Sequence, residues 1–346
     1  MTALALILAL FAAEPLNAAP AEPQARVMAR TYGVMGTEAT FSIFTADAER
    51  ADRAFGAAYD EIRRIELLMT DWERPGQPES DVVRINKAAG KHAVQVSEET
   101  MAVVLKSLEM SRKSEGAFDI TYAAMRGLWK FDEEMDRTLP APAAIERQRK
   151  LINWRDVVVD KRARTVMLRR PGQRLGLGGI AKGYAVDKCA DVLRGEGFHD
   201  FMVQAGGDLF VSGRKGTANW MVGVRDPRGG PTAVIAKMAI EDQAFSTAGD
   251  YERTFVLNGK RYHHIIDPKT GYPATASRGV TILAPNAFLA DGLDDAVFIL
   301  GPKKGLALVD AYPGCAAVIV DAKNQVWTSK SLQGKLIRTA APTDGI

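Results

Sequence analysis

The sequence contains few residues that bind soft metal ions. It has two cysteines and four histidines among 346 residues. Neither Cys189 nor Cys315 belongs to a C-x-x-C pair or lies near a second soft ligand, so no zinc site is predicted. We expect two buried structural thiols, and sequence alone does not decide whether they form a disulfide.

A strong charge excess and a long apolar run are also missing. Basic residues number 45 against 42 acidic ones, and a net charge of +3 gives no argument for nucleic-acid binding, which needs clustered Lys and Arg. Hydrophobic residues at 47% and charged residues at 25% exclude a disordered chain, a coiled coil and a collagen-like repeat. After the N-terminus no segment is apolar enough to span a membrane.

The chain opens with an apolar run over residues 3–13. Its eleven residues are too few to span a bilayer but suit the core of a signal peptide, and small residues follow at 17–19. No Lys or Arg precedes the run, which leaves a misplaced start codon or a weak anchor as alternatives. We expect an exported protein with a signal peptide over residues 1–19 and a linker over 20–30.

The rest of the chain predicts one large globular unit over residues 31–337, followed by a flexible tail over 338–346. Strand and helix patterns are mixed without strict alternation, which favours an α+β fold over a doubly wound sheet. The expected strands cover 39–45, 157–159, 165–168, 201–203, 209–211, 220–224 and 316–320. The expected helices cover 47–69, a segment that starts at Ser97, 181–193 and 288–300.

Two glycine-rich segments could form phosphate-binding turns. Glycines at 176, 178 and 179 precede a predicted helix, where backbone N–H groups can meet a phosphate and Lys182 adds a positive charge. The spacing matches neither a P-loop nor a dinucleotide fingerprint, so a simple strand-to-helix turn is an equal alternative. The second segment, Ala205-Gly206-Gly207-Asp208, is typical of a hairpin turn.

Two adjacent histidines, His263 and His264, precede a Pro-Lys-Thr-Gly turn at 268–271. Neighbouring side chains in a strand point to opposite faces, so at most one of them faces a given pocket. A structural role for the pair is the alternative.

Acidic residues gather on one predicted helix. Helical offsets place Asp291, Asp294 and Asp295 on one face. A solvated helix face is the alternative, but apolar residues on both sides predict that the helix is buried, and buried carboxylates need a cation or donors. Oxygen ligands without Cys or His favour Mg²⁺ over zinc. Together the motifs predict a phosphate-bearing ligand, a hard divalent cation and one histidine available as a base.

At these residues the chain resembles the ApbE family, the FAD:protein FMN transferases. The resemblance runs from about Tyr32 to Gly301. Its motifs are Val34-Met35-Gly36-Thr37, residues 80–86, Gly116-Ala117-Phe118-Asp119-Ile120-Thr121, residues 177–187, Gly206-Gly207-Asp208, Thr247-Ala248-Gly249-Asp250-Tyr251-Glu252-Arg253 and residues 264–273.

The resemblance implies an ApbE-like, T-fold-like architecture in a single large unit. It implies a periplasmic or membrane-side enzyme that takes FAD and uses Mg²⁺. Such an enzyme joins FMN through its phosphate to a Thr or Ser hydroxyl of a partner redox protein and releases AMP.

Family positions are carried over residue by residue. The positions implied to contact the flavin nucleotide are Met35, Trp72, Ala117, Phe118, Asp119, Gly176, Lys182 and Ile265. The metal positions implied are the main-chain oxygen of Gly179 and the side chains of Asp291, Asp294 and Asp295. His264 matches the essential histidine of the family, whereas His263 does not.

Two positions depart from the family pattern. The family usually has Thr where this chain has Asp295, and Asp where it has Gly176. These departures leave two alternatives to the transferase. One is a flavin-binding carrier or assembly factor that does not transfer FMN. The other is an Mg²⁺-dependent FAD pyrophosphatase that uses water as acceptor.

Overall fold

The computed structural model describes residues 24–131, 135 and 137–346. The predicted signal peptide, residues 1–19, and residues 20–23 of the predicted linker lie outside this part of the chain. Within it, no helix combines the length and the apolar character that crossing a membrane requires.

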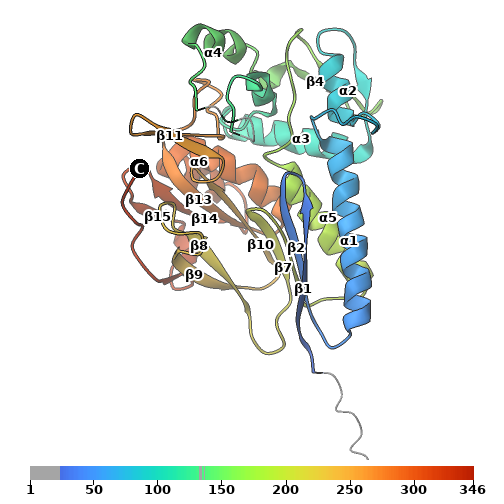
Figure 1. Ribbon diagram of the computed structural model, residues 1–346, viewed down its shortest axis with the longest axis vertical. Helices are drawn as coiled ribbons and strands as arrows, with labels where there is room; N and C mark the ends of the chain where they lie inside the picture. The colour runs from blue at the N-terminus through green and yellow to red at the C-terminus, as the bar shows by residue number, and fades with distance from the viewer. Residues whose placement is uncertain (1–23, 132–134, 136) are drawn as a thin grey trace, which may run out of the picture.

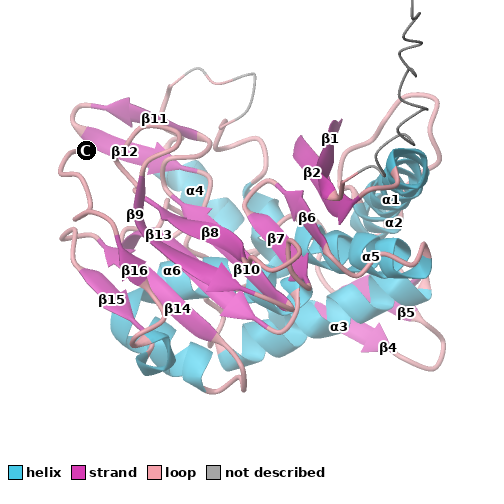
Figure 2. Ribbon diagram, turned by 90° about the horizontal axis from the view of Figure 1, so that it is seen from below, coloured by secondary structure: helices cyan, strands magenta, loops and turns pink. Residues whose placement is uncertain are grey.

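An eight-stranded antiparallel sheet forms the centre of the fold (Figures 1 and 2). Its strand order is β1-β2-β6-β7-β10-β13-β14-β15, so segments far apart in sequence pair side by side. These strands are β1 Arg26–Val34, β2 Thr37–Thr45, β6 Phe201–Ala205, β7 Asp208–Ser212, β10 Gln243–Gly249, β13 Ser277–Ala284, β14 Ala316–Asp321 and β15 Val326–Thr328.

Helices cover one face of this sheet. The four longest are α1 Ala48–Met69, α3 Glu98–Lys113, α5 Ala181–Gly195 and α6 Ala287–Asp310. α5 packs between α1 and α6, and α6 lies along β10, β13 and β14. The helix α6 is interrupted at Gly301, which has a φ of 70°, and Pro302 follows. The segment before this kink carries the acidic residues singled out above.

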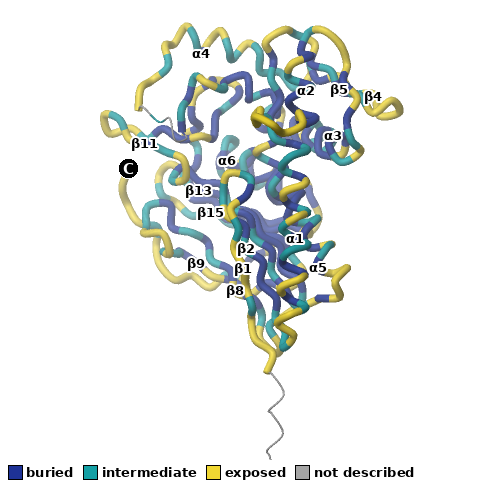
Figure 3. The backbone as a smooth tube through the Cα atoms, turned by 45° about the vertical axis from the view of Figure 1, so that its right-hand side comes forward, coloured by how far each residue is buried: buried dark blue, intermediate teal, exposed yellow. Residues whose placement is uncertain are grey.

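The other face of the sheet is covered by a small sheet with the strand order β16-β9-β8. Its strands are β8 Trp220–Arg225, β9 Val234–Ile240 and β16 Ile337–Arg338. Because both faces of the central sheet are buried, alternate residues of β14 join different cores. Ala317 and Ile319 pack with the helices, whereas Val318 packs with the small sheet. Figure 3 shows this buried interior as the dark blue central part of the tube.

Shorter elements gather at the end of the molecule that is uppermost in Figure 1. They form a three-stranded sheet, a hairpin, two short helices and two 3-10 turns. These elements are β3 Val94–Gln95, β4 Val157–Asp160, β5 Thr165–Leu168, β11 Thr254–Leu257, β12 Lys260–His263, α2 Asp81–Lys87, α4 Pro142–Arg149, η1 Ile120–Met125 and η2 Trp154–Asp156. A third 3-10 turn, η3, covers Lys330–Leu332 near the C-terminal end.

The expected α+β class and the expected strands and helices are confirmed, and both cysteines are buried free thiols. Two boundaries differ. The linker predicted over residues 20–30 includes the start of β1, because Arg26 pairs with Thr45 of β2. The tail predicted over 338–346 is held by hydrogen bonds: the Thr343 hydroxyl donates to Asp226 at 2.6 Å, and the Asn324 amide donates to a main-chain oxygen of the tail at 3.0 Å.

Candidate active site

A cluster of buried carboxylates lies where α6 crosses the sheet. Asp291 and Asp294 of α6 are 1% and 5% exposed, so the solvated-face alternative is wrong for these two residues. Carboxylate oxygens of Asp208, Asp291 and Asp294 all lie within 4.8 Å of one another. Asp208 begins β7 directly after the predicted glycine turn, which is confirmed as the β6–β7 hairpin. The sequence predicted Asp291 and Asp294 here but not Asp208.

Ser246 bridges two of these acids. It is opposite Asp208 in the β7–β10 pairing, and its hydroxyl contacts Asp208 and lies 2.7 Å from Asp294. A hydroxyl has one proton to donate, so it can donate to only one of the two carboxylates. The Ser246 hydroxyl thus ties the side chain of Asp294 to β10.

Lys182 contacts the cluster with its positive charge. Its ammonium lies 2.6 Å from Asp208 and 3.5 Å from Asp291. The charge of Lys182 also acts on Asp295. The position that was predicted to contact a nucleotide thus already neutralises part of the acidic charge.

Burial and mutual repulsion raise the pKa values of these acids. Burial, followed by the charge of Asp208, raises the pKa of Asp291 to about 7. Burial and its two acidic neighbours on α6 hold the pKa of Asp294 well above its usual range. The pKa of Asp295 is raised to about 6, chiefly by burial, while Lys182 opposes the shift. Excess negative charge in a buried all-oxygen set is the chemistry that a hard divalent cation relieves.

Gly179 and Asp295 lie against each other. A Cβ atom at Gly179 would come 2.9 Å from a carboxylate oxygen of Asp295 and 3.5 Å from Phe118. The glycine therefore allows the turn before α5 to approach α6. This contact brings two of the predicted metal positions together and places the predicted nucleotide residue Phe118 beside them.

Gly183 and Asp187 join α5 to α6. The Gly183 N–H donates to Asp291 at 2.7 Å, and a Cβ at this position would lie 2.2 Å from the main-chain oxygen of Ala287. One turn later, the carboxylate of Asp187 accepts from the N–H groups of Ala287 and Phe288 at 2.8 and 2.9 Å. These bonds cap the first turn of α6 and fix Asp291.

Replacing Gly183 with alanine is expected to lower the free energy of unfolding by about 3 kcal/mol or more, because the new methyl group meets main-chain atoms that cannot move aside. Gly195, at the end of the same helix, has no atom near its Cβ direction and provides the matched control. Thermal or urea unfolding measures both variants. Equal stability of the two would contradict the close packing of α5 and α6.

The predicted nucleotide position Asp119 already has internal partners. Its carboxylate accepts from the N–H and hydroxyl groups of Thr121, at 2.8 and 2.6 Å, and from the Trp154 N–H at 2.8 Å. This side chain shapes the Ala117–Asp119 turn. Contact with a nucleotide through that turn remains a prediction.

A Cβ atom at Gly176 would lie only 3.0 Å from the methyl group of Ala123, so a larger side chain here would press against η1. A carboxylate oxygen of Asp71 lies 3.7 Å from the same point. Asp71 pairs with Arg126 at 2.8 Å, and the Arg126 guanidinium stacks 3.5 Å above the ring of Trp72. The position where the family usually has Asp thus has a carboxylate nearby from another segment.

Two other predicted nucleotide positions differ in exposure. Trp72 is 58% exposed, whereas Ile265 is 4% exposed.

Met35 has a positive φ of 54° in the β1–β2 turn, and its N–H donates to Glu66 at 2.9 Å. None of these contacts brings Met35 or Trp72 to the acidic cluster.

The two histidines have different surroundings, as the strand geometry predicted. His263 is buried, its Nε2 lies 2.9 Å from the Ala274 oxygen, and its Nδ1 accepts from the Ile265 N–H at 3.3 Å. Both ring nitrogens of His263 are therefore used internally. His264 is accessible to solvent.

Several groups lower the pKa of His264 to about 3. The largest contribution is desolvation by the surrounding protein, followed by the neighbouring basic groups His263, Arg253 and Lys182, which disfavour a second positive charge. Solvent reaches the ring and screens part of the effect of these charges. His264 is a neutral imidazole at pH 7 and can accept a proton.

The sequence profile of the ApbE family matches residues 35–319. The chain is 30% identical over 302 residues to an FAD:protein FMN transferase of Klebsiella pneumoniae, covering 87% of this chain and 91% of that protein. It is 31% identical over 324 residues to an FAD:protein FMN transferase of Treponema pallidum, covering 89% and 88%. The chain belongs to the ApbE family.

Solved ApbE structures share its fold. The ApbE protein of Thermotoga maritima superposes with a TM-score of 0.79 at 29% identity, covering 92% of this chain and all of that one. The flavin transferase ApbE of Vibrio cholerae gives 0.78 at 23% identity, covering 90% and 99%. These similarities confirm the ApbE-like architecture predicted from the motifs.

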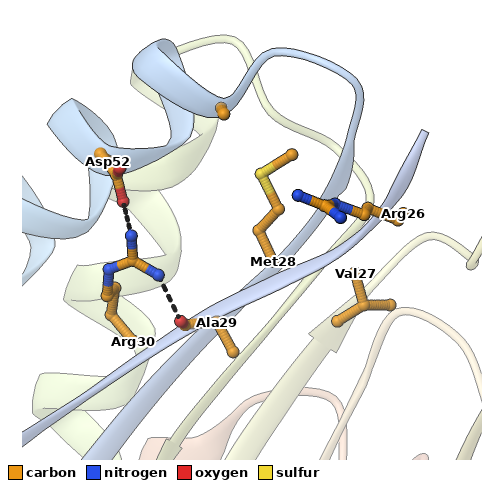
Figure 4. A pocket seen from close by; sticks show the side chains of 7 residues that line it. Arg26, Val27, Met28, Ala29, Arg30 and Asp52 are labelled. Carbon is orange, nitrogen blue, oxygen red and sulfur yellow. Dashed lines mark hydrogen bonds and ion pairs between the residues drawn. The ribbon is translucent and has the colours of Figure 1, made fainter. Parts of the chain in front are cut away.

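A pocket of about 340 Å³ lies away from this ApbE site (Figure 4). It is lined by residues 26–30, Ala48 and Asp52, at the start of β1, and the Arg30–Asp52 ion pair measures 2.7 Å. Met35 lies past the opposite end of the same strand, roughly 25 to 30 Å along an extended chain. The pocket is therefore not part of the candidate active site.

Proposed function

We propose that this protein transfers FMN from FAD to a partner redox protein. The oxygen of a Thr or Ser hydroxyl attacks the phosphorus of the FMN half, and the bond from that phosphorus to the bridging oxygen breaks. AMP leaves with that oxygen. The observation that carries the proposal is the acidic cluster with Lys182 beside the Gly179 turn, in an ApbE chain whose relatives are FAD:protein FMN transferases.

Mg²⁺ is the metal that we propose for this site. The donor set fits, because the three carboxylates that cluster in the described part of the chain outnumber the Lys182 ammonium that contacts them, and their ligand atoms are oxygens. Asp291, Asp295 and the main-chain oxygen of Gly179 would hold the ion, with Asp294 as a further acid at the same site. When bound, Mg²⁺ supplies positive charge for a diphosphate.

The side chains then divide the work of positioning and proton transfer. His264, neutral and open to solvent, accepts the proton of the attacking hydroxyl. Lys182 holds Asp208 and Asp291 in place and adds a positive charge beside the metal ligands. The turns at Ala117–Asp119 and Gly176, together with Met35, Trp72 and Ile265, are the proposed contacts for the nucleotide.

The relatives' names favour the transferase over the other two candidates, a carrier without transfer activity and an FAD pyrophosphatase. We also propose export to the periplasm, supported by the apolar run over residues 3–13. The acceptor would then be a periplasmic or membrane-bound flavin-accepting redox protein.

Mass spectrometry of an acceptor tests the function. A flavin-accepting electron-transfer domain with its Thr is incubated with this protein, FAD and Mg²⁺. A mass gain of one FMN that is abolished by a chelator is expected. Bound FAD without any gain would favour the carrier, and free FMN without acceptor modification would favour the pyrophosphatase.

Replacing Asp295 with alanine is expected to raise the Mg²⁺ concentration needed for half-maximal transfer by about tenfold or more, because a charged oxygen ligand is lost. A Mg²⁺ titration of the transfer rate measures the shift. An unchanged titration in a variant of unchanged thermal stability would exclude Asp295 as a ligand.

A further inference from the structure

The segment Asp250–Arg253 contains four polar residues, and two of them form ion pairs. The Asp250 carboxylate accepts two hydrogen bonds from the Arg228 guanidinium, at 2.6 and 2.7 Å. Glu252 accepts from Arg225 at 2.8 Å. Both acids are thus neutralised by arginines outside the segment. These two ion pairs anchor the loop between β10 and β11.

Tyr251 adds a third anchor. Its ring occupies the space above Gly249, where a Cβ would lie 2.2 Å away, and the Arg225 guanidinium stacks on it at 4.3 Å. The loop is therefore held by three consecutive side chains. The conformation of the fourth residue, Arg253, is set by these neighbours.

Arg253 is the charged residue of the segment that has no carboxylate partner. Among the described residues it forms no ion pair, and its guanidinium donates to the main-chain oxygen of Gly36 at 3.0 Å. The residue is exposed. A single bond to a carbonyl leaves most of its five N–H donors free for an anion.

Arg253 lies next to two parts of the candidate site, the β1–β2 turn and His264. Gly36 belongs to the β1–β2 turn that includes Met35, a proposed nucleotide contact. On the other side, Arg253 precedes Thr254, which pairs with His263 across the β11–β12 hairpin, so Arg253 lies beside His264. The charge of Arg253 contributes to the lowered pKa of that ring. The guanidinium of Arg253 therefore contacts the proposed nucleotide turn, while its main chain lies next to the proposed base.

We propose that Arg253 is a further catalytic residue, whose guanidinium binds phosphate oxygens of FAD and stabilises the negative charge that develops during transfer. This inference rests on the function proposed above. As the hydroxyl oxygen bonds to the FMN phosphorus, its proton goes to His264 and AMP leaves with the bridging oxygen. Arg253 neutralises charge on the oxygens of the transferred phosphoryl group, the role that arginine often has in phosphoryl transfer.

A purely structural role for Arg253, tying the loop to the β1–β2 turn, is the competing explanation. It predicts lower stability and no particular effect on the chemical step. Three variants separate the two roles: Arg253→Ala, Arg253→Lys and Arg214→Ala. Arg214 is a matched control, since it is exposed and donates to a main-chain oxygen at 3.0 Å in the loop after β7.

Single-turnover FMN transfer at saturating FAD and Mg²⁺ is the first measurement. We expect Arg253→Ala to reduce the rate by about a hundredfold or more, Arg253→Lys to recover at least about tenfold of that loss, and Arg214→Ala to stay within about twofold. A rate for Arg253→Ala within about threefold of the unmodified protein would overturn the proposal. A loss that lysine does not rescue, accompanied by a lower unfolding temperature, would also overturn it.

Calorimetric binding of ADP with Mg²⁺ is the second measurement, and it needs no transfer activity. ADP carries the adenosine and a diphosphate of FAD, so its affinity is expected to fall about tenfold in Arg253→Ala and to remain unchanged in Arg214→Ala. Failure of the unmodified protein to modify an acceptor would count against the proposed function alone. Equal ADP affinity in both variants would count against Arg253.

Discussion

Replacing His264 with alanine is expected to lower FMN transfer by a factor of about 10² to 10⁴, the usual contribution of a general base. FAD binding should stay within about threefold, because the exposed imidazole acts on the acceptor hydroxyl rather than on the nucleotide. Transfer is measured in a single turnover, and binding by titration of flavin fluorescence. His199, an exposed histidine before β6, provides a matched alanine control.

Loss of transfer and of FAD binding together would contradict this role and indicate a structural one.

The same histidine determines the pH dependence that we expect for transfer. Because the pKa of His264 is lowered, the ring stays neutral as the pH falls through 6.5, and becomes protonated only in more acidic solution. At Mg²⁺ concentrations that saturate the proposed metal site, the cation keeps Asp291 and Asp295 ionised, so transfer should persist below pH 6 and be lost further down. Under the same conditions, a loss centred near 6.5 would contradict the assignment of His264 as the base.

Replacing Asp291 with asparagine is expected to reduce transfer by at least about a hundredfold at any accessible Mg²⁺ concentration. The amide oxygen of asparagine can still accept the Gly183 N–H, so the contact between α5 and α6 is retained. What is lost is the charge that would hold the cation beside the diphosphate. Mg²⁺ binding is measured by calorimetry and transfer by mass spectrometry.

The control for this variant is Asp310→Asn, a change of the same chemistry at the exposed end of α6. It should leave both Mg²⁺ affinity and transfer unchanged. Removal of the Asp291 charge also leaves the ion pair between Lys182 and Asp208, at 2.6 Å, in place. If Asp291→Asn bound Mg²⁺ as tightly as the unmodified protein, the metal site proposed here would be wrong.

Local patterns in the sequence predicted much of this architecture. The face of α6 that carries Asp291 and Asp294 follows from helical offsets, and its burial follows from apolar residues on both sides of that helix. The β6–β7 turn follows from Gly206-Gly207, because glycine tolerates a left-handed backbone, and Gly206 has a φ of 58°. These features depend on neighbours within a few residues.

Long-range pairing explains what sequence patterns could not predict. Asp208 joins the acidic cluster because β7 pairs with β10, which places it opposite Ser246, 38 residues away. The partner arginines that neutralise Asp250 and Glu252 come from a different strand and loop. Asp119 shows the reverse case, in which a residue of a recognisable motif is used inside its own turn.

The kink in α6 separates two regions of hydrogen bonding. Pro302 has no N–H to donate, and Gly301 is outside the helical conformation, so the ladder of main-chain bonds is broken between residues 300 and 302. Fraying that starts at the Asp310 end is consequently expected to stop at this break, before it reaches the turns that carry the acids. The half of the helix with Asp291 and Asp294 should thereby keep its structure when the half that follows it unfolds locally.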